Sequence, residues 1–131
     1  MFHKKMLVCA SLSGAVCVAL GALGAHGFRD ILEQTLPVYE KAVFYQAVHT
    51  LALLALASLY QHFPDRRFAS AGWLWLAGIV LFSGSLYTYA LMKGMHNESF
   101  NWLVHVTPFG GLCFILGWLM IFYGTLKMKS S

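Results

Sequence analysis

The sequence predicts an all-α, polytopic membrane protein whose four transmembrane helices form an up-and-down bundle with both termini cytoplasmic. Hydrophobic residues make up 59% of the 131-residue chain and charged residues only 11%. Soluble domains carry about 25% charged residues, so this chain has too few to cover a water-facing surface. The apolar residues also gather into four long runs, with basic residues at their ends. The length suits one transmembrane domain over residues 1–131.

Each apolar run is long enough to cross a bilayer, because about 20 helical residues cover the hydrocarbon core. In lipid every backbone N–H and C=O group must be paired internally, which leaves helices or a closed barrel. The alternation with period two that a barrel needs is absent from the sequence. We therefore expect helical spans over residues 6–25, 42–60, 71–92 and 103–126.

The first run has an alternative interpretation. Its basic start, its apolar stretch and the sequence Ala22-Leu23-Gly24 resemble a secretory signal with a small-residue cleavage site. The run is longer than the apolar core of about 7–15 residues in such signals. We therefore expect a retained span rather than a cleaved leader.

The distribution of charge between the connecting segments predicts the orientation. An up-and-down path places six of the nine basic residues on one side: Lys4, Lys5, Arg66, Arg67, Lys127 and Lys129. The other side holds three basic residues and four of the five acids. Because cytoplasmic loops carry the excess of Lys and Arg, both termini are expected in the cytoplasm of a bacterial inner membrane.

The segment between the first two runs has an amphipathic pattern. Phe28, Ile31 and Leu32 would share one helical face, with Arg29 and Asp30 on the other. Such a pattern suits a short helix over residues 28–36 that lies in the membrane interface. An irregular loop whose apolar residues touch the headgroups is the alternative.

Glycines recur every seven residues along the predicted spans. Lipid tails are as apolar as leucine, so membrane helices associate by close packing across small residues. We expect these packing glycines to face the bundle interior: Gly14, Gly21, Gly78, Gly110, Gly117 and Gly124. Leucine at Gly21 or Gly117 should then cost more stability than leucine at Ala57.

Polar residues inside the spans share one depth. In the up-and-down path they all fall in the outer half of the bundle, where intramembrane polar groups are the default place to look for function. The predicted outer polar cluster consists of His26, Tyr45, Gln46, His49, Ser83, Ser85, His105 and Thr107. Hydrogen bonds that join helices without further function are the alternative interpretation of this cluster.

Two further hypotheses concern the histidines of this cluster. His26, His49 and His105 together could bind a metal ion if the fold brings them together. His49 and His105 could hold a haem, since their expected depths are comparable. Neither pattern is specific, so the sequence predicts no cofactor, no metal site and no catalytic residue.

Motif and composition exclude several function classes. The sequence contains no GxSxG, HExxH or Walker motif. Its basic residues do not form the continuous footprint that nucleic-acid binding needs. The three cysteines, Cys9, Cys17 and Cys113, are odd in number and form no CxxC pair, so they are expected to be packing residues. No carboxylate lies within a span, which weakens the case for a proton-coupled exporter.

Four sequence blocks, one in each span, together resemble a known family. They are VALGALGAH at 18–26, YQAVHTLA at 45–52, LFSGSLY at 81–87 and VTPFGG at 106–111, extended by Gly117-Trp118. In this order they resemble the YgdD/YwdK-like inner-membrane proteins of the UPF0382/DUF423 type. The resemblance implies a four-span bacterial inner-membrane protein, and it implies no substrate, cofactor or catalytic residue.

The most consistent function is therefore non-enzymatic. We expect an integral membrane protein that supports or binds other membrane components, with the lipid bilayer, a membrane-protein partner or a second copy of itself as partners, and no nucleic acid. A small carrier or channel that uses the outer polar cluster is the alternative, followed by a haem- or metal-binding protein.

Overall fold

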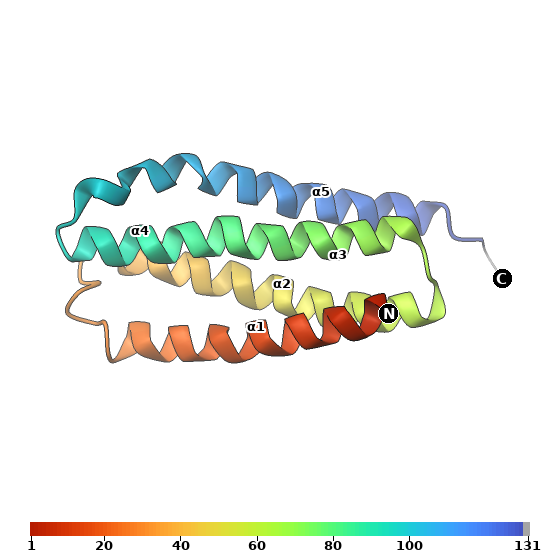
Figure 1. Ribbon diagram of the computed structural model, residues 1–131, viewed down its shortest axis with the longest axis horizontal. Coiled ribbons are helices and arrows are strands. Elements are labelled where there is room, and N and C mark those ends of the chain that lie inside the picture. The colour runs from red at the N-terminus through yellow and green to blue at the C-terminus, as the bar shows by residue number, and fades with distance from the viewer. Residues whose placement is uncertain (130–131) are drawn as a thin grey trace.

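The computed structural model describes residues 1–129 as an elongated bundle of four helical spans that lie side by side (Figure 1). The chain runs back and forth along the bundle, so the N-terminus, the C-terminal end of α5 and the α2–α3 turn lie at one end, here called the termini end (Figure 1). The segments between α1 and α2 and after α4 lie at the opposite end. The described residues contain no strand. The predicted all-helical class and the four apolar spans are thus confirmed.

All four helical spans begin before the predicted apolar runs, and the second and third also end after them. The first two spans are α1 (Phe2–Ala25) and α2 (Leu36–His62). The third consists of α3 (Arg66–Gly78), the π-helical η1 (Ile79–Ser83) and α4 (Gly84–Gly94). The fourth begins with the 3₁₀ helix η2 (Glu98–His105) and continues as α5 (Thr107–Leu126). Hydropathy marks only the part of a helix that lies in hydrocarbon, so the sequence predicted shorter spans.

Local signals in the sequence explain where two of the helices begin. Pro37 lies in the first turn of α2, where its missing N–H leaves no hydrogen bond unmade. Asp65 caps α3 by accepting a 2.7 Å hydrogen bond from the backbone N–H of Arg67, whose guanidinium also bonds the carboxylate. These hydrogen bonds from Arg67 hold the pKa of the Asp65 carboxyl below its ordinary value. The negative charge therefore persists at the N-terminus of α3, where the helix dipole favours it.

The interfacial helix expected over residues 28–36 does not form. Residues 26–35 make a series of turns that fold back onto the bundle. Leu32 is fully buried and packs in a cluster with Tyr39 and Tyr87. The Thr35 hydroxyl donates a 2.8 Å hydrogen bond to the carbonyl oxygen of Ala90. The amphipathic pattern thus reflects packing of a turn against α2 and α4 rather than contact with headgroups.

The spans pack as neighbours in a fixed order. α1 lies mainly against α2, α2 also lies against the third span, and α5 lies mainly against α3 and η1. One apolar cluster includes Met6, Leu53 and Phe68, and a second cluster around Leu32 and Tyr39 lies toward the opposite end. The interior is therefore divided along the bundle into two apolar regions.

The glycines of the fourth span lie directly against the third span. A β-carbon at Gly110 would overlap the backbone of Phe82, and one at Gly117 would overlap the indole of Trp75. One at Gly124 would come within 2.6 Å of the Phe68 ring. Gly78 faces back toward α5, where its β-carbon would overlap the Phe114 ring. Side chains at these positions would push the two spans apart.

Gly14 and Gly21 of the first span are less tightly enclosed. A β-carbon at Gly14 would lie 3.6 Å from the Thr50 side chain, and one at Gly21 would lie 3.6 Å from Val43, which are ordinary contact distances. Ala57, by contrast, is only 1% exposed. The structure therefore reverses the expected order for Gly21: leucine fits more easily there than at Ala57.

Candidate functional site

The eight residues of the predicted outer polar cluster do not form one site. Hydrogen bonds divide six of them among three separate groups, which are built around Gln46, around His49 with Tyr45, and around the serines of the third span. His26 and His105 are exposed at the ends of α1 and η2. The expected common depth is not found either, because His49 lies at the middle of α2 and contacts Trp118, whereas His105 lies just before α5 begins. Periodicity also could not predict the direction in which each helix turns these side chains.

Gln46 is the centre of a buried hydrogen-bonded chain that joins three spans. Its Nε2 donates to the carbonyl oxygen of Ser13 at 3.1 Å and to the Ser13 hydroxyl at 3.2 Å. The Tyr87 hydroxyl donates to Gln46 Oε1 at 2.7 Å. Ser13 and Thr50 also share a 2.8 Å hydroxyl–hydroxyl bond. Ser13, Thr50 and Tyr87 were missed by the sequence analysis, although the i, i+4 spacing of Gln46 and Thr50 indicated a shared polar face.

His49 is 3% exposed, and both of its ring nitrogens have partners. Its Nδ1 lies 2.8 Å from the carbonyl oxygen of Tyr45, and its Nε2 accepts a 3.1 Å bond from the Trp118 indole. Because an indole N–H can only donate, Nε2 carries no proton and the neutral ring holds its proton on Nδ1. The Phe114 ring stacks on the imidazole at 3.6 Å between centroids. His49 therefore joins α2 to α5 by a hydrogen bond, and neither ring nitrogen is available to a ligand.

The serines of the third span bond to its neighbours around the π-helical turn. The Ser83 hydroxyl donates a 2.8 Å bond to the carbonyl oxygen of Ala42 in α2. Ser85 and Thr107 share a 2.6 Å hydroxyl–hydroxyl bond that joins α4 to α5. A π-turn shifts the register of the residues after it, and here such a turn ends at Ser83, two positions before Ser85. These bonds satisfy the hydroxyls and join neighbouring spans.

The metal hypothesis is not supported by this arrangement. Within residues 1–129, no group of three or more His, Cys, Asp or Glu side chains is placed to hold a metal ion. His26 and His105 are exposed, whereas His49 is enclosed between α2, Trp75 and α5. A haem bond to His49 would also require the loss of one of its two existing hydrogen bonds. His49 contacts Phe114 and Trp118, which follow His105 by 9 and 13 residues along the fourth span, so these two histidines differ in depth as well as in position.

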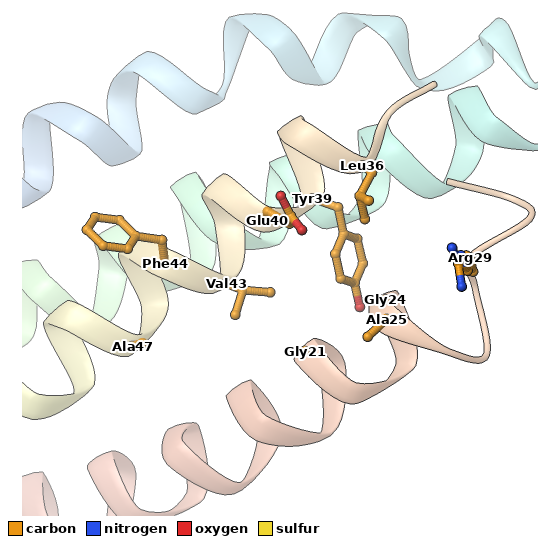
Figure 2. Close-up of a pocket in the computed structure, with 10 residues that line it drawn as sticks. All are labelled: Gly21, Gly24, Ala25, Arg29, Leu36, Tyr39, Glu40, Val43, Phe44 and Ala47. Carbon is orange, nitrogen blue, oxygen red and sulfur yellow. The ribbon is translucent and has the colours of Figure 1, made fainter. Parts of the chain in front are cut away.

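A groove lies between α1 and α2 (Figure 2). Its volume is about 630 Å³, which lies within the range of about 300–1,000 Å³ for small-molecule sites. The residues that line it are Gly21, Gly24, Ala25, Arg29, Leu36, Tyr39, Glu40, Val43, Phe44 and Ala47. Most of this lining is apolar, and the two charged residues lie toward the opposite end of the bundle. The sequence analysis did not predict a groove here.

Small residues in α1 create the groove. Gly21, Gly24 and Ala25 present almost no side chain to α2, so the space between the two helices stays unfilled at this level (Figure 2). Tyr39 crosses the gap, packs against Gly24 and donates a 2.5 Å hydrogen bond to the carbonyl oxygen of Leu20. The tyrosine holds α1 at a fixed separation from α2. The small residues 21, 24 and 25 belong to the sequence block at 18–26, so this block has a geometric role.

Comparison with known proteins identifies the family. Residues 20–111 match the sequence profile of the family described as "Protein of unknown function (DUF423)". The chain belongs to the DUF423 family. A UPF0382 membrane protein of Haemophilus influenzae is 44% identical to it over 129 residues, which cover 97% of this chain and 98% of the relative. The resemblance inferred from the four sequence blocks is therefore confirmed.

Two further relatives of this DUF423 member carry names that state a membrane location. The UPF0382 inner membrane protein YgdD of Escherichia coli is 37% identical, with 98% of this chain and 95% of the relative covered. The UPF0382 membrane protein YwdK of Bacillus subtilis is 36% identical, with 95% and 98% covered. No solved structure matches the chain. Together with the four apolar spans, these similarities establish a protein of the bacterial inner membrane.

Proposed function

We propose that this DUF423 protein is non-enzymatic and works by binding another component of the membrane at the α1–α2 groove. The groove carries the proposal, because it is a mainly apolar hollow on a membrane-embedded surface and two charged residues lie at one end of it. The buried polar residues support the non-enzymatic part of this proposal. Those around Gln46, His49 and Ser83 are bonded to one another or to backbone carbonyl oxygens, which suits structural hydrogen bonds between helices.

We further propose that both termini lie in the cytoplasm. The termini end holds Lys4 and Lys5, the α2–α3 turn with Arg66 and Arg67, and Lys127 beyond α5 (Figure 1). This excess of positive charge at one end is the arrangement that the positive-inside rule associates with the cytoplasmic face. The groove would then open in the outer half of the membrane.

Cysteine labelling in intact cells tests this orientation. Ser99 and Gln61 are exposed at opposite ends of the bundle. In a variant whose three native cysteines are replaced by alanine, a membrane-impermeant maleimide should label Ser99→Cys in intact cells. It should label Gln61→Cys only after the cells are opened. The reverse pattern would contradict the proposed orientation.

Native mass spectrometry of protein purified in a mild detergent tests binding at the groove. The wild-type protein should retain a tightly bound membrane component. Gly21→Leu should lose it, because the leucine side chain would enter the groove beside Val43. Ala19→Leu is the matched control, since Ala19 is exposed on α1 and does not line the groove. We expect retention to fall at least tenfold in Gly21→Leu and to stay unchanged in Ala19→Leu.

Two results would contradict binding at the groove. Equal retention by wild type and Gly21→Leu, with both proteins folded by circular dichroism, would place the bound component elsewhere. Solute flux into proteoliposomes that is lost in His49→Ala and unaffected by Gly21→Leu would favour the carrier alternative.

A further inference from the structure

We infer that the occupant of the α1–α2 groove is a phospholipid whose zwitterionic head carries a primary ammonium group. Its phosphate would bind Arg29, its ammonium would bind Glu40, and one acyl chain would lie along the apolar part of the groove. This inference rests on the proposed function, since it names the class of membrane component that the groove binds. It is argued from the charges of the groove, its depth and its apolar lining.

The charges of the groove are one cation and one anion. Arg29 lies on the segment after α1, and Glu40 lies near the start of α2 (Figure 2). Both side chains are exposed, and both line the groove. The ion pairs among residues 1–129 are Arg67–Asp65 and Lys93–Glu98, so Arg29 and Glu40 are not paired with each other. A ligand with one negative and one positive group would complement them.

The flanking charged residues do not alter this balance inside the groove. Asp30 and Glu33 line a separate polar hollow together with Lys93. Lys41 is exposed and does not line the groove. The charge that a headgroup meets at the groove therefore comes from Arg29 and Glu40.

The two signs of charge discriminate among membrane lipids. An anionic lipid would bring its phosphate to Arg29 but would place no cation opposite Glu40. A lipid with a quaternary ammonium has the right charge but no N–H group to donate to the carboxylate. A primary ammonium has three donors, and charge-assisted hydrogen bonds are roughly twice as strong as neutral ones. Arginine binds phosphate through paired N–H donors.

The position of the groove suits a lipid that enters from the bilayer. Arg29 and Glu40 lie at the end of the spans, where headgroups lie, and the groove extends along α2 from Leu36 to Ala47. At 1.5 Å per residue this is about 16 Å, or roughly half of the hydrocarbon thickness. The lining at this depth is Val43, Phe44 and Ala47 with Gly21 opposite, so an acyl chain meets only apolar surface.

A competition experiment with defined lipids tests the inference. Delipidated protein is exchanged into nanodiscs made from equimolar phosphatidylethanolamine, phosphatidylcholine and phosphatidylglycerol with identical acyl chains. Bound lipid is then counted by native mass spectrometry after release in detergent. We expect the wild-type protein to prefer phosphatidylethanolamine over each competitor by roughly fivefold. Glu40→Gln should abolish the preference over phosphatidylcholine, and Arg29→Gln should reduce retention of all three lipids.

The controls separate this inference from the proposed function. Both substituted residues are exposed, so the variants should unfold at the wild-type temperature, and Lys41→Gln should bind as the wild-type protein does. The wild-type protein could retain lipid that Gly21→Leu loses, yet show no headgroup preference or prefer phosphatidylglycerol. That result would overturn the headgroup assignment while groove binding stands. If a protein partner occupies the groove instead, the lipid inference is overturned while groove binding stands. If no form retains any lipid or partner, the inference and the proposed function both fail.

Discussion

Replacing Gly110 with alanine should destabilise the bundle by about 3 kcal/mol, the upper end of the usual cost of overpacking. The added β-carbon would overlap the backbone nitrogen and α-carbon of Phe82. A flexible side chain could turn away, but a helical backbone can only move as a unit. α5 must therefore shift away from the third span, and contacts along the whole α5 seam weaken. Thermal or denaturant unfolding in dodecyl maltoside measures the loss.

Gly84 supplies the matched control for this substitution. It lies in the neighbouring span, and a β-carbon there would meet no atom within 4 Å. Alanine favours a helix over glycine by up to about 1 kcal/mol, so Gly84→Ala should unfold at or above the wild-type temperature. If Gly110→Ala and Gly84→Ala had equal stability, the close approach of α5 to the third span would be wrong.

The contrast between these two glycines shows what the sequence could and could not predict. The number and helical nature of the spans follow from hydropathy and length, because the bilayer sets the length of a span and requires its backbone groups to be paired internally. The seven-residue spacing of Gly110, Gly117 and Gly124 correctly indicated a shared face of α5. It could not show that this face meets the third span, since spacing describes one helix and not its neighbour. Gly84 has the same residue type as Gly110 and meets nothing.

The polar residues show the same limit more sharply. Hydropathy placed Gln46 and His49 within the second span, and both lie in α2. Their partners Ser13, Tyr87 and Trp118 come from other spans. Which residues meet depends on how each helix is rotated about its axis, and the sequence of one span does not show this. The π-helical turn before Ser85 adds a shift of register that no regular period contains. The predicted cluster therefore separated into groups that join different sets of spans.

The groove was missed because it is formed by side chains that are absent. Polar and reactive side chains mark a site in a sequence, whereas Gly21, Gly24 and Ala25 contribute only space. Their effect depends on Tyr39, which holds α1 against α2 through its hydrogen bond to Leu20. Small residues in a membrane helix are usually interpreted as packing sites. Here three of them leave a hollow that opens beside two charged side chains.

Trp75→Ala should also cost about 3 kcal/mol, for a different reason. Trp75 is 2% exposed and packs against Trp118 with 4.6 Å between ring centroids, against His49, and against Gly117. Its removal would leave a cavity that α5 cannot close without losing contact with the rest of α3. In soluble cores such truncations cost about 3–5 kcal/mol. The low end applies in a membrane, because hydrophobic transfer from water contributes little there.

Two further tryptophan variants determine which property of Trp75 matters. Trp73→Ala removes a 51% exposed indole two positions away and should cost less than about 1 kcal/mol. The Trp75 indole N–H is buried and has no hydrogen-bond partner in residues 1–129. Trp75→Phe deletes this unpaired donor and keeps most of the ring, so it should cost less than half as much as Trp75→Ala. A loss equal to that of Trp75→Ala would contradict the conclusion that the indole contributes mainly by packing. The unfolding midpoints of the three variants in one detergent decide between packing and hydrogen bonding at the centre of the bundle.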